Sequence, residues 1–541
     1  MSRKPAKTSA TSLTVKQATF DLLRAFGIKK VFGNPGSTEL PFLSDWPGDI
    51  DYVLGLQEAS VVGMADGYAQ ATRNAGFVNL HSAAGLGNAL GNIFTAYRNQ
   101  TPLVITAGQQ ARSILPWQPF LYAERATEFP RPYVKFAVEP ARAEDVPAAI
   151  ARAYYVAMQP PCGPTFVSVP IDDWTHPAQA VEARSVSREF GPDPDALKML
   201  ATALAASKRP ALVVGPGVDR AQAVDWTVRL AEKTRAAVWV SPFSARCSFP
   251  ERHRQFSGFL QASPAEVSSA LRHHDLVVVI GAPVFTFHVE GHAAIFDGAT
   301  TIFQITDDPD AAAITPVGTS ILASVKPALA RLIELLPETD RAKPVGRTLP
   351  PAPRASDPIA AEFLLHALSS AMPDDAVLVE EAPSHRPAMQ NFMPMHGQDS
   401  FYTMSSGGLG HGLPAAVGIA LGRPGVRTVC LIGDGSAMYS IQALWTAAQR
   451  KLPLTVVVLN NLGYGAMRSF SQVMQVRNVP GLDLPDIDFA KIAQGLGCDA
   501  ARVTKSSELA PALKRALAHA GASLIEVMVD SAVPLLYGRK G

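Results

Sequence analysis

The chain has 541 residues, of which 47% are hydrophobic and 18% charged, and its formal net charge is +1. This is the composition of a globular protein of about three domains, and the balanced charge argues against nucleic-acid and polybasic membrane partners. Four scattered cysteines without a Cys-x-x-Cys pair indicate neither a zinc site nor a disulfide scaffold. No apolar run is long enough to span a membrane, so we expect a cytoplasmic protein.

The first block, residues 1–186, begins with a polar stretch, residues 1–12, that we expect to be a disordered tail. Beyond it the pattern predicts helices at 15–26 and 58–73 and strands at 30–32, 52–56 and 77–80. Strands that alternate with helices are typical of a parallel sheet covered by helices. We therefore expect an α/β domain.

The second block, residues 195–343, lies between two proline-containing stretches that we interpret as linkers, 187–194 and 344–358. Apolar runs again predict strands. The first of them, Ala211–Val214, is followed by Gly215-Pro-Gly217, which lacks the third glycine of the dinucleotide fingerprint. We interpret this block as a Rossmann-like spacer domain without a flavin or nicotinamide site.

The third block, residues 359–541, is weakly similar to the first. Thr95-Ala96 and Pro102-Leu103 recur 351 residues later as Thr446-Ala447 and Pro453-Leu454. The predicted fold class is therefore α/β with three doubly wound parallel sheets, in which two domains of one type flank a third.

The third block also contains the most informative motif. Gly433-Asp-Gly-Ser436 follows a predicted strand, and Asn461 follows the next one, 27 residues after Asp434. A helix is predicted between them at 440–450. The ends of neighbouring parallel strands open onto one edge of the sheet. A carboxylate and an amide oxygen suit Mg²⁺, and glycines let a phosphate approach the backbone. The motif predicts a metal–diphosphate site.

This spacing resembles the thiamine diphosphate motif, in which Gly-Asp-Gly precedes Asn-Asn by about 25 residues. The cofactor implied is thiamine diphosphate with Mg²⁺ (or Ca²⁺ or Mn²⁺). Glu58 begins a predicted helix in the first block, where this family places the carboxylate that activates the aminopyrimidine. Gly407 and Leu409, in Ser405–Gly410, match the loop that supplies a carbonyl acceptor and an apolar wedge.

Motifs in all three blocks resemble the benzoylformate decarboxylase family more closely. They are Gly33–Glu39, Leu56–Ala59, Asn79–Gly85, Thr106–Gln110, Ile280–Phe285, Gly407–Gly410, Ala443–Gln449 and Asn478–Asp483. The resemblance implies a pyrimidine-binding domain at 1–186, a central domain at 195–343 and a diphosphate- and Mg-binding domain at 359–541. It also implies a homotetramer, a dimer of dimers, with active sites at the dimer interface.

The same resemblance implies decarboxylation of an aryl 2-oxo acid to aldehyde and CO₂ through a thiamine ylide. The catalytic residues implied are Glu58, Ser37, His81 and His288. The implied metal ligands are Asp434, Asn461 and the Gly463 carbonyl. Other cofactor contacts are assigned to Gly433, Gly435, Ser436 and Tyr464, beside Gly407 and Leu409.

The substrate pocket departs from the family pattern. The positions assigned to it are Phe120, Leu121, Pro383, Thr403, Ala466 and Phe470. Pro383 stands in place of a threonine, Thr403 in place of an aromatic residue, and Phe120 in place of a leucine. Two alternatives stay open: a lyase or carboligase of benzaldehyde lyase or 2-hydroxyacyl-CoA lyase type, and a non-catalytic cofactor-binding scaffold.

Overall fold

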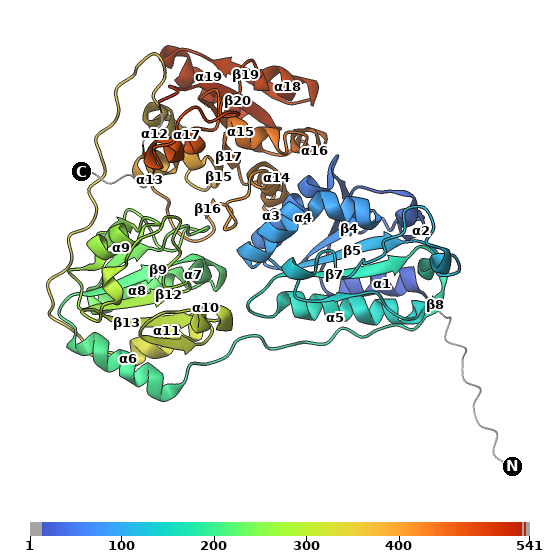
Figure 1. The fold of residues 1–541 in the computed structure, drawn as a ribbon, viewed down its shortest axis with the longest axis horizontal. Helices are drawn as coiled ribbons and strands as arrows, with labels where there is room; N and C mark the ends of the chain where they lie inside the picture. Colours follow the sequence, from blue (N-terminus) through green and yellow to red (C-terminus); the bar gives the residue numbers. More distant parts are fainter. Residues whose placement is uncertain (1–12, 533–534, 537–541) are drawn as a thin grey trace. The chain divides into compact units, whose positions relative to one another are not determined.

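The computed structural model describes residues 13–532 and 535–536, so the predicted N-terminal tail lies outside the described residues. Within them the chain forms three six-stranded parallel sheets and one antiparallel pair, β1 (Leu13–Thr14) with β8 (Pro177–Ala178) (Figure 1). The sheets fall into two compact units, Met1–Val186 and Ser187–Gly541. The predicted α/β class with three parallel-sheet domains is confirmed.

Besides the β1–β8 pair, the first unit contains one six-stranded sheet with helices on both faces. Its strands, in spatial order, are β3 (Asp51–Leu54), β2 (Lys30–Gly33), β4 (Gly76–Leu80), β5 (Leu103–Gln109), β7 (Pro164–Pro170) and β6 (Ala137–Val138). Its helices are α1 (Val15–Ala25), α2 (Leu40–Leu43), α3 (Glu58–Thr72), α4 (Ser82–Asn99) and α5 (Val146–Met158). Helix α1 starts where a capping box dictates, because Thr14 and Gln17 bond each other's backbone amides.

The last sheet of the chain repeats this topology. Its spatial order is β16 (Phe401–Tyr402), β15 (Val377–Glu381), β17 (Thr428–Gly433), β18 (Leu454–Asn460), β20 (Ser523–Met528) and β19 (Asp499–Val503). Numbered within each domain, both sheets read 2-1-3-4-6-5, as the predicted likeness of the two blocks requires. Its helices are α12 (Ala361–Ala371), α13 (Arg386–Phe392), α14 (Gly412–Gly422), α15 (Asp434–Met438), α16 (Ala443–Gln449), α17 (Gly465–Val473), α18 (Phe489–Gly495) and α19 (Ser506–Ala518).

The central sheet has a different order, 3-2-1-4-5-6, which is the Rossmann order. Its strands are β11 (Phe256–Phe259), β10 (Ala237–Val240), β9 (Pro210–Val214), β12 (Leu276–Ile280), β13 (Thr301–Thr306) and β14 (Thr319–Leu322). Its helices are α6 (Pro194–Ala206), α7 (Pro216–Arg220), α8 (Val224–Thr234), α9 (Pro264–Leu271), α10 (Pro309–Ala313) and α11 (Val325–Leu335).

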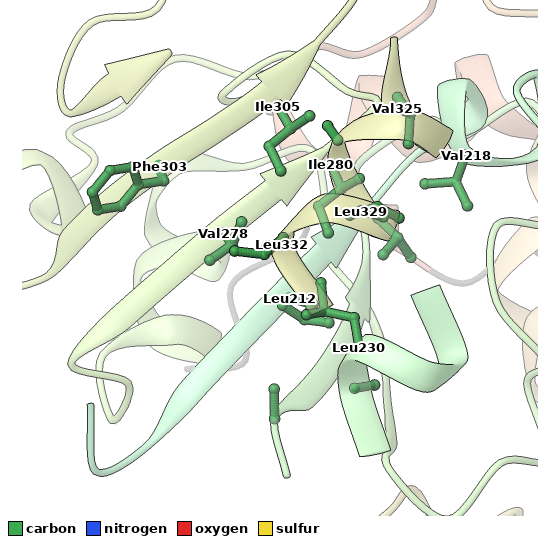
Figure 2. Close-up of a cluster of buried hydrophobic side chains, with 14 of the residues drawn as sticks. Leu212, Val218, Leu230, Val278, Ile280, Phe303, Ile305, Val325, Leu329 and Leu332 are labelled. Carbon is green, nitrogen blue, oxygen red and sulfur yellow. The ribbon is translucent and has the colours of Figure 1, made fainter. Parts of the chain in front are cut away.

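Alternate residues of the central strands point to opposite faces of the sheet and pack in two separate hydrophobic cores. Leu212, Val278 and Ile305 pack with Leu230 of α8 and Leu329 of α11 on one face (Figure 2). Their strand neighbours point to the opposite face and pack with α9. A strand buried on both faces needs an unbroken apolar run, which is why these strands were recognisable in the sequence.

The glycine loop after β9 closes on the loop after β12. The amide of Gly217 donates to the carbonyl of Gly281 at 2.9 Å, and a Cβ on Gly217 would lie 2.8 Å from the Cα of Gly281. This contact occupies an amide that a phosphate-binding version of the loop would present to its ligand.

The helix predicted at 440–450 is present as α16 (Ala443–Gln449), and a short helix before it, α15, was not predicted. The chain turns from β17 directly into α15 at Asp434, and a second helix, α16, follows after a break. The reason is local: Oδ1 of Asp434 accepts from the amide of Gly435 at 2.7 Å and fixes the first turn. The metal–diphosphate motif is therefore itself helical.

The central and last domains are joined through a buried arginine. Arg246 donates through Nε to Asp219 at 2.7 Å and through Nη2 to Asp399 at 3.0 Å. Its guanidinium also lies 4.0 Å from the ring centroid of Tyr402. Burial alone would lower the pKa of Arg246, but the two carboxylates and Tyr402 raise it above its usual range.

Replacing Arg246 by alanine is expected to destabilise the protein by about 3–5 kcal/mol, because the variant leaves the buried Asp219 carboxylate without its cation. The free energy of unfolding in urea measures this. Arg254→Ala removes an exposed arginine 3.9 Å from Glu232 and serves as the control, with an expected cost below about 1 kcal/mol. Equal losses of unfolding free energy in the two variants would contradict the role of Arg246 in holding the central and last domains together.

Candidate active site

The metal–diphosphate motif is folded around Asp434 at the end of β17. This side chain is 3% exposed. Its Oδ1 accepts from the amide of Gly435, and its Oδ2 accepts from the amide of Gly463 at 2.9 Å. Burial raises the pKa of Asp434, although both amides act in the opposite direction. The loop after β18 and the motif after β17 are thus held together by one carboxylate.

Asn461 lies on that second loop and is 2% exposed. Its side-chain nitrogen is buried without a hydrogen-bond partner among the described residues. The Gly463 carbonyl accepts from the amide of Gly465 at 2.9 Å, and Gly463 itself has a φ of +158°. The structure therefore brings all three predicted metal ligands onto two adjacent loops.

The other predicted phosphate contacts surround the same turn. Gly433 precedes α15, and the buried Ser436 lies within that helix. The ring of Tyr464 covers Gly435, where a Cβ would lie 2.5 Å from the ring. Only a glycine at 435 leaves room for this ring.

The loop that carries Gly407 and Leu409 lies between β16 and α14. Gly407 is exposed and has a φ of +74°, and the half-buried Leu409 follows it. A Cβ at Gly407 would meet nothing within 4 Å. The backbone at Gly407 is therefore open to a ligand.

His288 of the central domain meets the last domain at Phe470 of α17. The two rings stack at 4.9 Å with an interplanar angle of 20°, and Phe243 lies 5.9 Å from His288. Ala466 lies on the same helix, and Pro383 begins the short 3₁₀ helix η7 (Pro383–His385), which packs against it.

Thr403, predicted to line the substrate pocket, is 1% exposed. Its hydroxyl donates to the Glu380 carbonyl at 2.8 Å and accepts from Arg386 at 2.6 Å. Arg386 is also ion-paired with the buried Glu380 carboxylate. A polar network therefore stands where the family pattern places an aromatic residue.

In the first unit, Glu58 begins α3 and lies opposite the start of α4. Its Oε2 accepts from Asn88 at 3.0 Å, and a Cβ on Gly85 would lie 3.2 Å from its Oε1 and 3.5 Å from the Cβ of His81. The structure therefore places both Glu58 and His81 close to Gly85.

His81 follows β4 as the N-cap of α4, and it contacts two buried residues, Thr38 and Glu39, of η1 (Ser37–Glu39). Its Nδ1 lies 2.9 Å from Oε2 of Glu39 and 3.0 Å from the hydroxyl of Thr38. Glu39 is 1% exposed and also accepts from the amides of Gly36 and Gly108. Since a carboxylate only accepts hydrogen bonds, Nδ1 carries the shared proton and Nε2 is left for other partners. Ser37, the first residue of η1, is exposed.

Phe120 and Leu121 lie in the segment after β5. Phe120 is 87% exposed, and Leu121 has a φ of +66°. The carbonyl of Leu121 accepts from the hydroxyl of Ser82 at 2.8 Å, which ties this segment to the start of α4, next to His81.

Three family models match the chain in succession. They are the N-terminal binding domain of thiamine pyrophosphate enzymes at 13–126, the central domain at 197–332 and the C-terminal binding domain at 382–527. The chain belongs to the thiamine pyrophosphate enzymes.

Within this family the chain is similar to benzoylformate decarboxylases over nearly its full length. It is 43% identical to benzoylformate decarboxylase of Pseudomonas aeruginosa over 526 residues, which cover 96% of this chain and 100% of the relative. The crystal structure of benzoylformate decarboxylase from Polynucleobacter necessarius superposes with a TM-score of 0.94 at 42% identity, covering 97% and 100%. The structure of the 4-hydroxybenzoylformate decarboxylase of Rhodococcus jostii RHA1 superposes with a TM-score of 0.92 at 42% identity. The match covers 96% of this chain and 100% of that structure.

The residues present fit the cofactor of a thiamine pyrophosphate enzyme and its metal. The buried Asp434 carboxylate and the partnerless amide nitrogen of Asn461 mark a polar site that the described protein groups do not complete. Among the described residues no group of three or more His, Cys, Asp or Glu gathers. A site with one carboxylate, one amide and one carbonyl, which leaves positions for phosphate oxygens, is typical of Mg²⁺.

Within the described part of the chain, no helix has the length and apolar content that a membrane span requires.

Glu39 is the functional candidate that sequence reasoning missed. Glu39 lies in the motif Gly33–Glu39, but nothing local distinguishes it from the exposed Ser37 two residues earlier. Its partners, His81 and Gly108, come from two other strand ends, 42 and 69 residues away. Only the order β2-β4-β5 in the sheet reveals the cluster.

Replacing Glu39 by glutamine is expected to lower kcat/KM by about 10–100-fold, because a charge-assisted hydrogen bond to His81 of about 1.5–3 kcal/mol is lost. Steady-state kinetics check this, with thermal unfolding as the test of fold. Glu144→Gln, an exposed glutamate of the same unit, is the control. Unchanged kcat/KM in the Glu39 variant would show that His81 does not depend on this carboxylate.

Proposed function

We propose that this protein decarboxylates an aryl 2-oxo acid without oxidation, releasing an aldehyde and CO₂. The observation that carries the proposal is the 43% identity to a benzoylformate decarboxylase over 96% of the chain, because it spans all three domains at once. When bound, thiamine diphosphate supplies the nucleophilic carbon and the electron sink for this chemistry.

The last domain would hold the cofactor. Asp434, Asn461 and the Gly463 carbonyl are the proposed Mg²⁺ ligands, with Gly433, Gly435, Ser436 and Tyr464 around the diphosphate. Gly407 would accept a hydrogen bond from the aminopyrimidine through its carbonyl, and the Leu409 side chain would pack against the cofactor. Glu58 would share a proton with the ring nitrogen of the aminopyrimidine.

Three further side chains would handle the substrate. Ser37 would bind its carboxylate through a hydroxyl that adds no negative charge. His81, oriented by Glu39, would in its doubly protonated form give the Nε2 proton to the carbonyl oxygen, and His288 would give one at the former carbonyl carbon. The stacking of His288 on Phe470 would fix its ring. Pro383, Thr403, Ala466, Phe120 and Leu121 would shape the pocket.

The direct test is a substrate panel with the purified protein, thiamine diphosphate and Mg²⁺. CO₂ and aldehyde are measured with benzoylformate and 4-hydroxybenzoylformate, and cleavage is measured with benzoin and a 2-hydroxyacyl-CoA. We expect release of CO₂ from an aryl 2-oxo acid. Cleavage of benzoin or the acyl-CoA without any such release would establish the lyase alternative, and cofactor binding without turnover would establish a scaffold.

We also propose a homotetramer whose active sites form at a dimer interface, and a cytoplasmic location. Support for the assembly is the resemblance to the benzoylformate decarboxylase family together with the exposure of Phe120. Sedimentation equilibrium of the cofactor-bound protein tests it, and a monomer at micromolar concentration would contradict it.

A further inference from the structure

Glu381 is the last residue of β15, and no role has been assigned to it above. Its side chain is fully buried. Oε1 accepts from the amide of Gly410 at 2.7 Å, and Oε2 accepts from the amide of His411 at 2.9 Å and from that of Gly412. One carboxylate therefore binds three consecutive amides at the point where the Gly407 loop enters α14.

The loop fits closely against this anchor on one side and against Tyr439 on the other. A Cβ on Gly412 would lie 2.7 Å from the Cβ of Glu381, and a Cβ on Gly410 would lie 2.7 Å from that of Tyr439. Gly410 also has a φ of +96°, which favours glycine. The two glycines thus let the backbone approach close enough for the carboxylate to reach all three amides.

The carboxylate and the amides complement each other. The first amides of a helix have no acceptor within the helix. Burial raises the pKa of Glu381 to about 7, whereas these amides and His411 favour its charged form. Gly407, by contrast, is exposed, and nothing lies within 4 Å of where its Cβ would be. Gly407 itself is not packed, whereas the bonds to Glu381 hold the same loop three residues further along, at 410–412.

We propose that Glu381 is a positioning residue of the cofactor site, which fixes the loop so that Gly407 and Leu409 meet the aminopyrimidine of thiamine diphosphate. This inference rests on the cofactor contacts proposed above for Gly407 and Leu409. It assigns Glu381 no contact with the substrate or with the reacting atoms.

The test is the binding of thiamine diphosphate to Glu381→Gln in the presence of Mg²⁺, measured by calorimetry, with hydrogen–deuterium exchange on the same protein. Glutamine has the same shape as glutamate, but one of the two oxygens is replaced by an NH₂ group. At least one of the three backbone amides therefore faces a donor and loses its hydrogen bond. We expect Kd to rise at least about tenfold and exchange to accelerate at 410–412. The KM for the cofactor should rise more than kcat falls.

Glu251→Gln is the matched control. Glu251 is also a buried glutamate of the second unit that accepts from a backbone amide, that of Met395 at 3.0 Å. Burial raises its pKa to about 8, while the Met395 amide and Arg347 act in the opposite direction. Its Kd for thiamine diphosphate should equal that of the wild type.

A Glu381→Gln protein with wild-type Kd and exchange would overturn the proposal, and so would exchange accelerated throughout the second unit, which indicates a general structural role. If Glu381→Gln does not fold, the same measurements are made on Glu381→Asp. Aspartate keeps the charge on a shorter side chain and should also raise the Kd for thiamine diphosphate. The measurements use the cofactor without substrate, so a failure of the proposed decarboxylation would not mimic either outcome.

Discussion

Replacing Glu58 by glutamine is expected to leave the fold intact and to lower kcat by about 10²–10⁴-fold, the range typical of a lost proton-transfer group. In the wild type, the side-chain nitrogen of Asn88 donates to Oε2 of Glu58 at 3.0 Å. Glutamine retains an oxygen that can accept this hydrogen bond, so the contact between α3 and α4 should persist. An amide cannot share its proton with the aminopyrimidine as a carboxyl can. Activation of the bound cofactor should therefore fail while its binding remains.

The measurement is kcat at saturating cofactor, together with the Kd for thiamine diphosphate and the circular dichroism spectrum. Glu144→Gln, with an exposed side chain paired to Arg142 in the same unit, is the control and should behave as the wild type. Near wild-type kcat in the Glu58 variant would remove Glu58 from the proposed mechanism.

Replacing Asp434 by asparagine is expected to abolish the stabilisation that cofactor and metal confer. A ligand at 100 times its Kd stabilises a folded protein by about 2.7 kcal/mol. Asparagine removes the negative charge that the proposed Mg²⁺ site needs. It also has only one side-chain oxygen, so it cannot accept hydrogen bonds from the amides of both Gly435 and Gly463 as the two oxygens of Asp434 do. Both the metal and the loop geometry should be lost.

The free energy of unfolding with and without thiamine diphosphate and Mg²⁺ measures this effect. EDTA added to the wild type should reproduce the variant, because Asp434 is proposed to act on the cofactor through the metal. Asp499→Asn, an exposed aspartate of the same domain, is the control. An equal gain of stability on adding cofactor to the Asp434 variant would exclude this residue as a metal ligand.

Several parts of the site were predictable because they are local. Gly433-Asp-Gly-Ser436 and Asn461 each follow an apolar strand, and adjacent parallel strands end at the same edge of the sheet. The bond from Gly463 to Asp434 is the consequence. The short helix α15 was not predictable in this way, because periodicity does not show that Asp434 itself starts a helix.

The sequence alone determined the three-domain α/β fold, the cofactor and the metal motif, since each depends on apolar periodicity or on short motifs with a fixed spacing. The tertiary structure alone decided which buried carboxylates support the site. Glu39 reaches His81, and Glu381 reaches Gly410–Gly412, across 29 or more residues. The reason is physical: a hydrogen bond depends on the distance in space between strand ends and loops, and the sheet order that sets this distance is not a local property of the chain.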